Sequence, residues 1–437
     1  MRALRVVAGM LVLSLAGCGV LPAPAEPGRS SSPAAKPAAK PADVVTKSLR
    51  DVERYWTGEF PRLASGTKFR PVTGGFHPYT ERKPAPDCGG VATGYQPNAF
   101  YCPDGDFIAW DAQNLIPQLQ EDYGPLLVGV VMAHEYGHAV QVRLGKTRQP
   151  TVVLEQQADC YAGAWLADVR AGHSTAFKKP TAAQLDTTVA GILMLRDQPG
   201  TSATAEGAHG NAFDRIRAFQ EGIQQGAKKC AGYDADNLQV TEVPFSDRQE
   251  AASGGDLPYD KAITLLAQDA QAYWTRTFPD LANQEWQPVK VETFDTHAPS
   301  CPDKDATANG AAFYCRSGDF IAFDGQNLGP QLYDRIGDFA VGMLLGDLFA
   351  RAAQDRRGAS TSGRSGQLTV DCLAGSWTND LLTRDRSGND LRLSPGDLDE
   401  AVAALLAFGR GGTGGASAFD RISAYRKGVL EGLGVCG

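Results

Sequence analysis

The side chains best suited to chemistry are two histidines four residues apart, with a glutamate directly after the first. His134, Glu135 and His138 form an HExxH motif inside an apolar segment, 124–144, that has the length and spacing of a buried helix. Positions i and i+4 share a helix face, so both imidazoles can bind one metal while Glu135 stands beside the open coordination position. The alternative is two core histidines with a chance glutamate between them. With only six histidines in the chain, that alternative is disfavoured.

A catalytic zinc site needs a third protein ligand. Glu155 and Asp159 are also four residues apart and lie on the next predicted helical segment, 152–169. Their spacing allows Glu155 to bind the metal and Asp159 to accept a hydrogen bond from a ligand histidine, which fixes its tautomer. Carboxylates on a solvated helix face would look similar. His173 or His209 could instead be the third ligand, but His173 is in a polar loop and His209 is far along the chain.

Two longer segments carry a resemblance to a known family: MAHEYGHAVQ from Met132 and LEQQADCYAG from Leu154. Together with FYCP from Phe100, and with His209-Gly210 followed by Arg215 and Phe219, they resemble the signature of the bacterial neutral zinc metallopeptidases, a gluzincin-like group. The resemblance covers essentially all of residues 44–232.

This resemblance implies a zincin-like metallopeptidase fold, one Zn²⁺ held by His134, His138 and Glu155, and a peptide or protein substrate. Zinc lowers the pKa of water to about 7, so Glu135 is expected to act as general base and to pass the proton to the leaving amine. Ala139 departs from the family, which often has a further histidine there. That position turns away from the metal face, so ligation is not affected.

The chain contains an internal repeat, with matching segments in the same order. Segments that begin at Tyr55, Phe100, Asp159 and Ala212 return at Tyr273, Phe313, Asp371 and Ala418. We therefore predict two tandem homologous domains, a first copy over 44–232 and a second copy over 257–437. The acidic and polar segment 233–256 between them is predicted to be a linker.

The second copy lacks the metal-binding residues of the first. In the register of the repeat, Asp347, Leu348, Arg351 and Gln367 replace the two histidines and the two glutamates. We predict a non-catalytic copy that contacts the first copy or an envelope partner, because the fold is kept while the chemistry is lost.

The comparison between the two copies also indicates roles for His209 and Asp159. His209 falls opposite Gly415, so it disappears together with the metal ligands and is a candidate for stabilising the oxyanion of the transition state. The alternative is a surface histidine beside Gly210. Asp159 persists as Asp371, which shifts it toward a structural role, such as capping or bonding the backbone near a disulfide.

Eight cysteines, four in each copy, predict disulfides. Four cysteines allow three connectivities, and pairing the first with the second and the third with the fourth keeps each bridge between features found in both copies. A metal bound by cysteines would need closer clustering. The eight are Cys88, Cys102, Cys160, Cys230, Cys301, Cys315, Cys372 and Cys436.

The first residues predict export. A basic end and an apolar run, 6–16, are followed by Leu15-Ala16-Gly17-Cys18, which resembles the lipobox of bacterial lipoproteins. We predict a signal peptide over 1–17, a lipidated Cys18, and a tether rich in proline and alanine over 18–43. An ordinary secretory signal is the alternative. The protein is then expected at the outer face of the membrane in the bacterial cell envelope, anchored by lipid.

The overall composition limits the classes of function that remain. The 437 residues carry a formal net charge of −8 and no basic block, which argues against a nucleic-acid partner. We expect a helix-rich α+β fold, with a strand over 100–110 followed by long helices. Three functions compete: a lipid-anchored zinc metallopeptidase, which the combined motif favours, a non-catalytic binding or scaffold lipoprotein that contains zinc, and a zinc hydrolase for other amides or esters.

Overall fold

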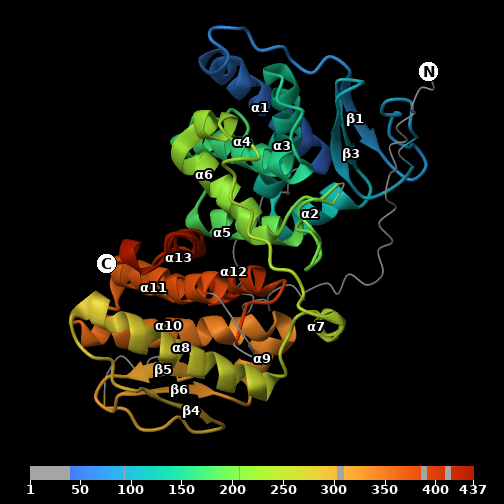
Figure 1. Ribbon diagram of the computed structural model, residues 1–437. Coiled ribbons are helices and arrows are strands. Elements are labelled where there is room, and N and C mark those ends of the chain that lie inside the picture. The colour runs from blue at the N-terminus through green and yellow to red at the C-terminus, as the bar shows by residue number, and fades with distance from the viewer. Residues whose placement is uncertain (1–39, 93, 206, 303–309, 385–390, 409–414) are drawn as a thin grey trace, which may run out of the picture.

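The computed structural model describes residues 40–92, 94–205, 207–302, 310–384, 391–408 and 415–437. Cys18 and the predicted signal peptide lie outside the described residues. The fold is α+β and rich in helices, as predicted, with two small sheets (Figure 1). In the part of the chain that the structure describes, no helix combines the length and apolar character that a bilayer span requires.

The first set of elements runs from α1 to α6. The helices are α1 (Pro41–Leu63), α2 (Leu115–Tyr123), α3 (Pro125–Leu144), α4 (Thr151–Ala171), α5 (Ala182–Met194) and α6 (Ala212–Ala231). The strands are β1 (Gly75–Tyr79), β2 (Ala99–Cys102) and β3 (Phe107–Asp111), in the sheet order β1-β3-β2. Strand β3 pairs in parallel with β1 and antiparallel with β2, which leaves β2 at the sheet edge next to α3.

A second set of elements follows in the same order after a short helix α7 (Arg248–Ser253). Its helices are α8 (Tyr259–Ala282), α9 (Leu328–Arg335), α10 (Asp338–Arg356), α11 (Gly363–Thr383), α12 (Asp397–Phe408) and α13 (Ala418–Glu431), with a final turn of 3₁₀ helix (Leu433–Val435). Its strands are β4 (Lys290–Phe294), β5 (Ala312–Cys315) and β6 (Phe320–Asp324), in the order β4-β6-β5. Strand directions match those of the first sheet.

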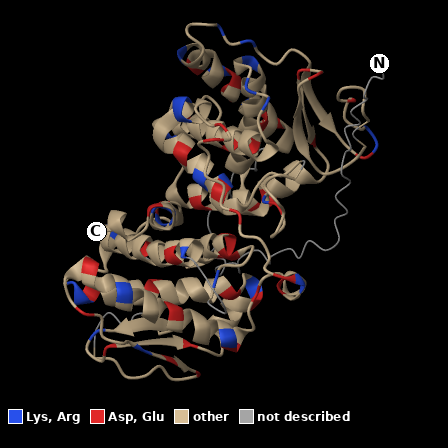
Figure 2. Cartoon of the chain, viewed as in Figure 1, with Lys and Arg blue, Asp and Glu red and all other residues tan. Residues whose placement is uncertain are grey.

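The two sheets lie at opposite ends of the molecule, and helices meet between them. Helices α5 and α6 contact α12 and α13 along this boundary (Figure 1). Acidic and basic residues are interspersed along the ribbon of both sets of elements (Figure 2). This distribution agrees with the absence of a basic block in the sequence.

In each copy, two glycines allow two helices to pack closely against each other. A Cβ atom built on Gly163 of α4 would lie 2.0 Å from the carbonyl oxygen of Phe219, and one on Gly222 of α6 would lie 1.9 Å from that of Cys160. Side chains at these positions would force α4 and α6 apart. Gly375 and Gly428 form the same contact between α11 and α13. The sequence repeat is therefore accompanied by the same close backbone packing in both sets of helices.

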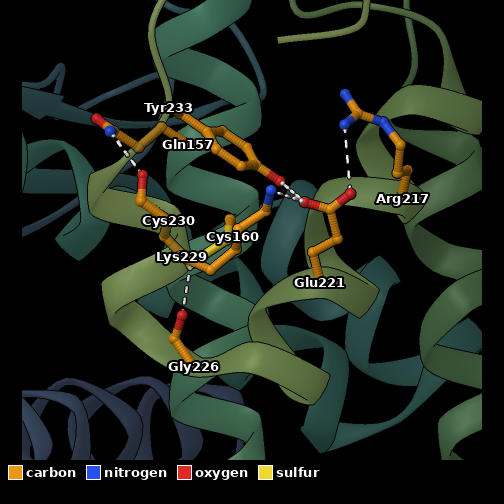
Figure 3. The surroundings of a disulfide bond; sticks show 8 residues. All are labelled: Gln157, Cys160, Arg217, Glu221, Gly226, Lys229, Cys230 and Tyr233. Atoms are coloured by element: carbon orange, nitrogen blue, oxygen red, sulfur yellow. Dashed lines mark hydrogen bonds and ion pairs between the residues drawn. A yellow bond between two sulfur atoms is a disulfide. The ribbon is translucent and has the colours of Figure 1, made fainter. Parts of the chain in front are cut away.

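Four disulfides join the eight cysteines in the predicted pairs, Cys88–Cys102, Cys160–Cys230, Cys301–Cys315 and Cys372–Cys436. The bridge between Cys160 and Cys230 links α4 to the end of α6 (Figure 3). Around it, Gln157 donates to the carbonyl of Cys230 at 2.9 Å, and Tyr233 donates to Glu221 at 2.7 Å. The helix that carries Glu155 is thus tied to α6 by a covalent bond and by polar contacts.

Three expected boundaries differ from the structure. The single strand expected over 100–110 is wrong: it is two strands, because Asp106 adopts a φ of +48° in a turn held by its bonds to Thr73 and Arg143. Helix α1 begins at Pro41, inside the segment expected to be tether. The segment expected to be a plain linker includes α7, and its Thr241 donates to the buried Asp214.

Candidate metal centre

The two histidines of the HExxH motif lie on α3, a helix that is buried almost all round. Its start is fixed by Gly124-Pro125 and its end by Gly145 in the left-handed conformation. Helix α4 begins after Pro150 and packs along α3. The histidine face of α3 thereby meets the face of α4 that carries Glu155 and Asp159.

Three ligand atoms converge at this contact. The Nε2 atoms of His134 and His138 are 3.2 Å apart, and they lie 3.2 and 3.5 Å from the carboxylate oxygens of Glu155. One ligand atom from each of the three residues lies within 4.8 Å of the other two. We refer to His134, His138 and Glu155 as the ligand group. Two imidazole nitrogens and a carboxylate oxygen are a donor set that zinc accepts in catalytic sites.

The outer nitrogens of both histidines are already engaged. Nδ1 of His134 is 2.8 Å from Oδ1 of Asp159, and Nδ1 of His138 is 3.0 Å from Oε1 of Gln141. Gln141 in turn donates to the carbonyl of Leu154 at 2.6 Å, next to Glu155. These bonds place a proton on each Nδ1 and turn each Nε2 lone pair toward the ligand group, so the residues present fit a zinc ion.

Electrostatics in the ligand group reflect its burial. Burial alone would lower the pKa of His134, but Asp159 and Glu155 raise it to about 10. Burial would raise the pKa of Glu155, but the two histidines hold it below its usual range. Metal ligands bind in their deprotonated forms, so a metal ion would compete with protons for these groups.

Asp159 has two partners. Besides His134, it binds the guanidinium of Arg215 on α6, with distances of 2.8 Å from Nε to Oδ2 and 3.0 Å from Nη2 to Oδ1. Burial would raise the pKa of Asp159, but Arg215 and His134 hold it below its usual range. The expected bond to a ligand histidine is present in the structure. Among the described residues, the Asp159 carboxylate accepts no hydrogen bond from a backbone N–H near the disulfide, and Arg215 occupies that part of the carboxylate instead.

Glu135 lies beside the ligand group and is buried. Its Oε2 accepts the backbone N–H of Tyr101 at 3.0 Å, a contact between α3 and the edge strand β2. Burial raises the pKa of Glu135, while His134 and His138 lower it. Sequence patterns did not reveal Tyr101, because its contribution comes from the main chain. The repeated FYC segment was the only signal at that position.

His209 lies on the loop directly before α6, and its neighbour Gly210 packs against α4, where a Cβ atom built on Gly210 would lie 3.4 Å from Val152. Its side chain is 51 % exposed, and its Nδ1 lies 3.3 Å from Oδ1 of Asp197. The bond to Asp197 raises the pKa of His209, and the charge of Glu155 adds to this effect. Neither His209 nor His173 belongs to the ligand group. The ring of His173 instead pairs with Asp168 at 3.1 Å.

The corresponding place in the second copy is filled by ion pairs. Asp347, in the register of His134, lies 2.5 Å from the guanidinium of Arg351, which stands for His138. Arg421 is 3.6 Å from Asp347 and 2.7 Å from Asp371. The pair between Asp371 and Arg421 therefore corresponds to that between Asp159 and Arg215, while the imidazole positions hold opposite charges that satisfy each other.

Comparisons with known proteins agree with the motif. The chain matches over residues 6–233 a family described as "Putative neutral zinc metallopeptidase". Proteins of Mycobacterium bovis and Mycobacterium tuberculosis, described as uncharacterized, are 39 % identical over 99 residues, which cover 18 % of this chain and 32 % of theirs. The chain thus spans about a third of the length of these curated relatives. No solved structure matches. The chain belongs to the neutral zinc metallopeptidase family.

Proposed function

We propose that the protein is a zinc-dependent metallopeptidase that hydrolyses peptide bonds in the bacterial cell envelope, at the outer face of a membrane to which a lipid on Cys18 anchors it. The observation that carries this proposal is the ligand group with Glu135 beside it. The lipobox-like segment and the disulfides support an exported protein.

We further propose two tandem homologous domains of zincin-like fold, of which only the first is catalytic. The matching order of strands and helices supports this division. The second copy has Asp347 and Arg351 paired where the imidazoles stand in the first. The second copy thus lacks both imidazole donors, and a guanidinium occupies one of their positions, which disfavours a cation there.

The ligand group would hold one zinc ion. When bound, zinc supplies a Lewis acid that polarises the substrate carbonyl and makes water acidic near neutral pH. Asp159 and Gln141 keep the two imidazoles oriented for this ion through their bonds to Nδ1. Arg215 holds Asp159 in place from α6, so α3, α4 and α6 together define the geometry.

Proton transfer is the task of Glu135. Its Oε2 is fixed by the N–H of Tyr101, which leaves Oε1 to accept a proton from water and to return it to the leaving amine. His209, anchored by Asp197, is placed to donate a hydrogen bond to the substrate oxygen as negative charge develops there.

A peptide-cleavage assay tests this function. The purified protein is incubated with a broad peptide library, with and without a zinc chelator, beside its Glu135→Gln variant. We expect cleavage that the chelator abolishes, that added zinc restores and that the variant lacks. Absence of cleavage by a protein shown to hold zinc would favour a binding lipoprotein. Cleavage of non-peptide amides or esters alone would favour the other hydrolase class.

A further inference from the structure

The boundary between the copies has the pattern of an interface between identical subunits. The carboxylate of Asp186 on α5 accepts the N–H of Phe419 on α13 at 2.8 Å, and that of Asp399 on α12 accepts the N–H of Phe213 on α6 at 2.9 Å. Leu185-Asp186 corresponds to Leu398-Asp399 in the repeat, and Phe213 corresponds to Phe419. Each copy therefore caps a helix of the other in the same way, as in a two-fold symmetric dimer.

The contacts of Asp399 and Asp186 differ at the second carboxylate oxygen. Its Oδ2 lies 3.2 Å from Nε of Arg196 in the first copy, and the Asp399 side chain is 5 % exposed. The register that matches Asp186 to Asp399 places Gly409 opposite Arg196, and within the described residues Asp186 forms no ion pair across the boundary. Asp399 thus has an ion pair with the first copy that Asp186 lacks among the described residues of the second.

Arg196 and Phe213 bracket the segment that carries His209. Asp197, directly after Arg196, accepts the N–H groups of His209 at 2.7 Å and of Gly210 at 2.8 Å. Its own N–H donates to the carbonyl of Gly210 at 3.1 Å. Asp399 contacts both of these connected segments. It forms an ion pair with Arg196, directly before Asp197, and it accepts the N–H of Phe213 in the first turn of α6.

This segment packs against the helix that carries Glu155. A Cβ atom built on Gly210, next to His209, would lie 3.4 Å from Val152 and 3.7 Å from Nε2 of Gln156, which directly follows Glu155. Two residues beyond Phe213, Arg215 holds Asp159, and through it His134. A shift of Arg196 and of the first turn of α6 would therefore displace His209, whereas Arg215 is held in addition by its two bonds to Asp159.

We propose that Asp399 of the second copy is a positioning residue for the first: by holding Arg196 and the first turn of α6, it fixes His209 beside the ligand group. This inference rests on the proposed function. In this proposal, the second copy, which lacks the metal-binding residues, has a positioning role that requires no metal.

The interface offers a matched control for this proposal. Asp399→Asn and Asp186→Asn each remove one carboxylate from equivalent places between the copies, but only Asp399 touches Arg196. We expect Asp399→Asn to lower kcat by about 10- to 100-fold with KM and zinc content unchanged. Asp186→Asn is expected to stay within about twofold of the wild type. Arg196→Gln breaks the same ion pair without touching the second copy and should reproduce the loss.

Two further measurements separate positioning from general stability. In a His209→Gln background, Asp399→Asn should change kcat by less than about twofold, because the group it positions is gone. Independently of activity, NMR of isotope-labelled histidines should show the pKa of His209 falling toward its usual value in Asp399→Asn but not in Asp186→Asn, since the bond to Asp197 raises it.

Three results would overturn the proposal: equal losses in the two interface variants, a loss that persists in the His209→Gln background, or a His209 pKa that Asp399→Asn does not move. Failure of the proposed function would look different. A wild type that cleaves no peptide leaves kcat undefined, but the NMR titration of the purified protein still decides whether Asp399 positions His209.

Discussion

Asp159 and Arg215 form a buried ion pair, with Nε of the guanidinium 2.8 Å from Oδ2 of the carboxylate. The equivalent pair, Asp371 and Arg421, persists in the second copy although the histidines there are gone. The pair therefore joins α4 to α6 in both copies as part of the fold. In the first copy, Asp159 also binds Nδ1 of His134, so one carboxylate has a structural and an orienting role.

This double role predicts different effects of the same substitution in the two copies. Asp159→Asn should weaken zinc affinity by about 10- to 100-fold, because the charged acceptor of the His134 ring is lost. Asp371→Asn should leave zinc affinity unchanged. Competition with a chromophoric chelator measures both. Equal zinc affinities in wild type and Asp159→Asn would show that the carboxylate orients nothing.

The disulfides allow a second comparison between copies. Replacing Cys160 and Cys230 by serine should lower the free energy of unfolding by roughly 2–5 kcal/mol and also weaken zinc binding, because the bridge ties α4 beside Asp159 to α6. Replacing Cys372 and Cys436 should have a similar effect on stability alone. Denaturant unfolding and zinc titration test the pair. Zinc affinity that is unchanged in the first variant, or under dithiothreitol, would contradict this link.

The glycine contact between α4 and α6 predicts an unusually costly alanine. Gly222→Ala would place a methyl group 1.9 Å from the carbonyl oxygen of Cys160 and should destabilise the protein by about 3 kcal/mol or more. Gly58→Ala, on the exposed face of α1 with no atom within 4 Å of the new Cβ, should instead stabilise it by roughly 0.5–1 kcal/mol. Urea unfolding measures both. A neutral Gly222→Ala would mean that the helices can separate without cost.

A group of acids at the start of α10 predicts a pH effect. Burial raises the pKa of Asp338 to about 6, the N–H of Leu257 lowers it, and Asp256 raises it. Asp397, Glu400 and Tyr333 also face Asp338. Because the folded state binds this proton more tightly than the unfolded state, stability falls as pH rises from about 4 through about 6.

Asp338→Asn removes this titration and keeps an oxygen that can accept the N–H of Leu257. The variant should be more stable than the wild type by roughly 1–2 kcal/mol at pH 7. This difference should vanish near pH 4. Thermal unfolding across this pH range is the measurement, with the exposed Glu285→Gln as control. A variant that is less stable than wild type at pH 7 would contradict the assignment.

Much of the site could be predicted because it depends on local spacing. Helix periodicity alone places His134 and His138 on one face, and a short turn limits where Glu155 can lie. The cysteine pairs followed from their repetition. The helix-rich α+β class followed from long periodic segments.

The remainder depends on contacts between distant segments. The main-chain N–H of Tyr101, which holds Glu135, has no residue type to reveal it. The pairing of Asp159 with Arg215 joins residues on two helices, and sequence alone does not show which charges meet. The division of segment 100–110 into two strands did have a local signal, because Pro103-Asp104-Gly105-Asp106 is a turn sequence, and the bonds of Asp106 to Thr73 and Arg143 add to it.

The most direct test of a catalytic zinc centre measures zinc per chain and peptide cleavage on the same preparations. Wild type and Glu135→Gln should each hold one zinc per polypeptide, and only the wild type should cleave. His138→Ala should lose both zinc and activity, because the ligand group then lacks one of its nitrogens. Full cleavage by Glu135→Gln, or undiminished zinc in His138→Ala, would contradict the account.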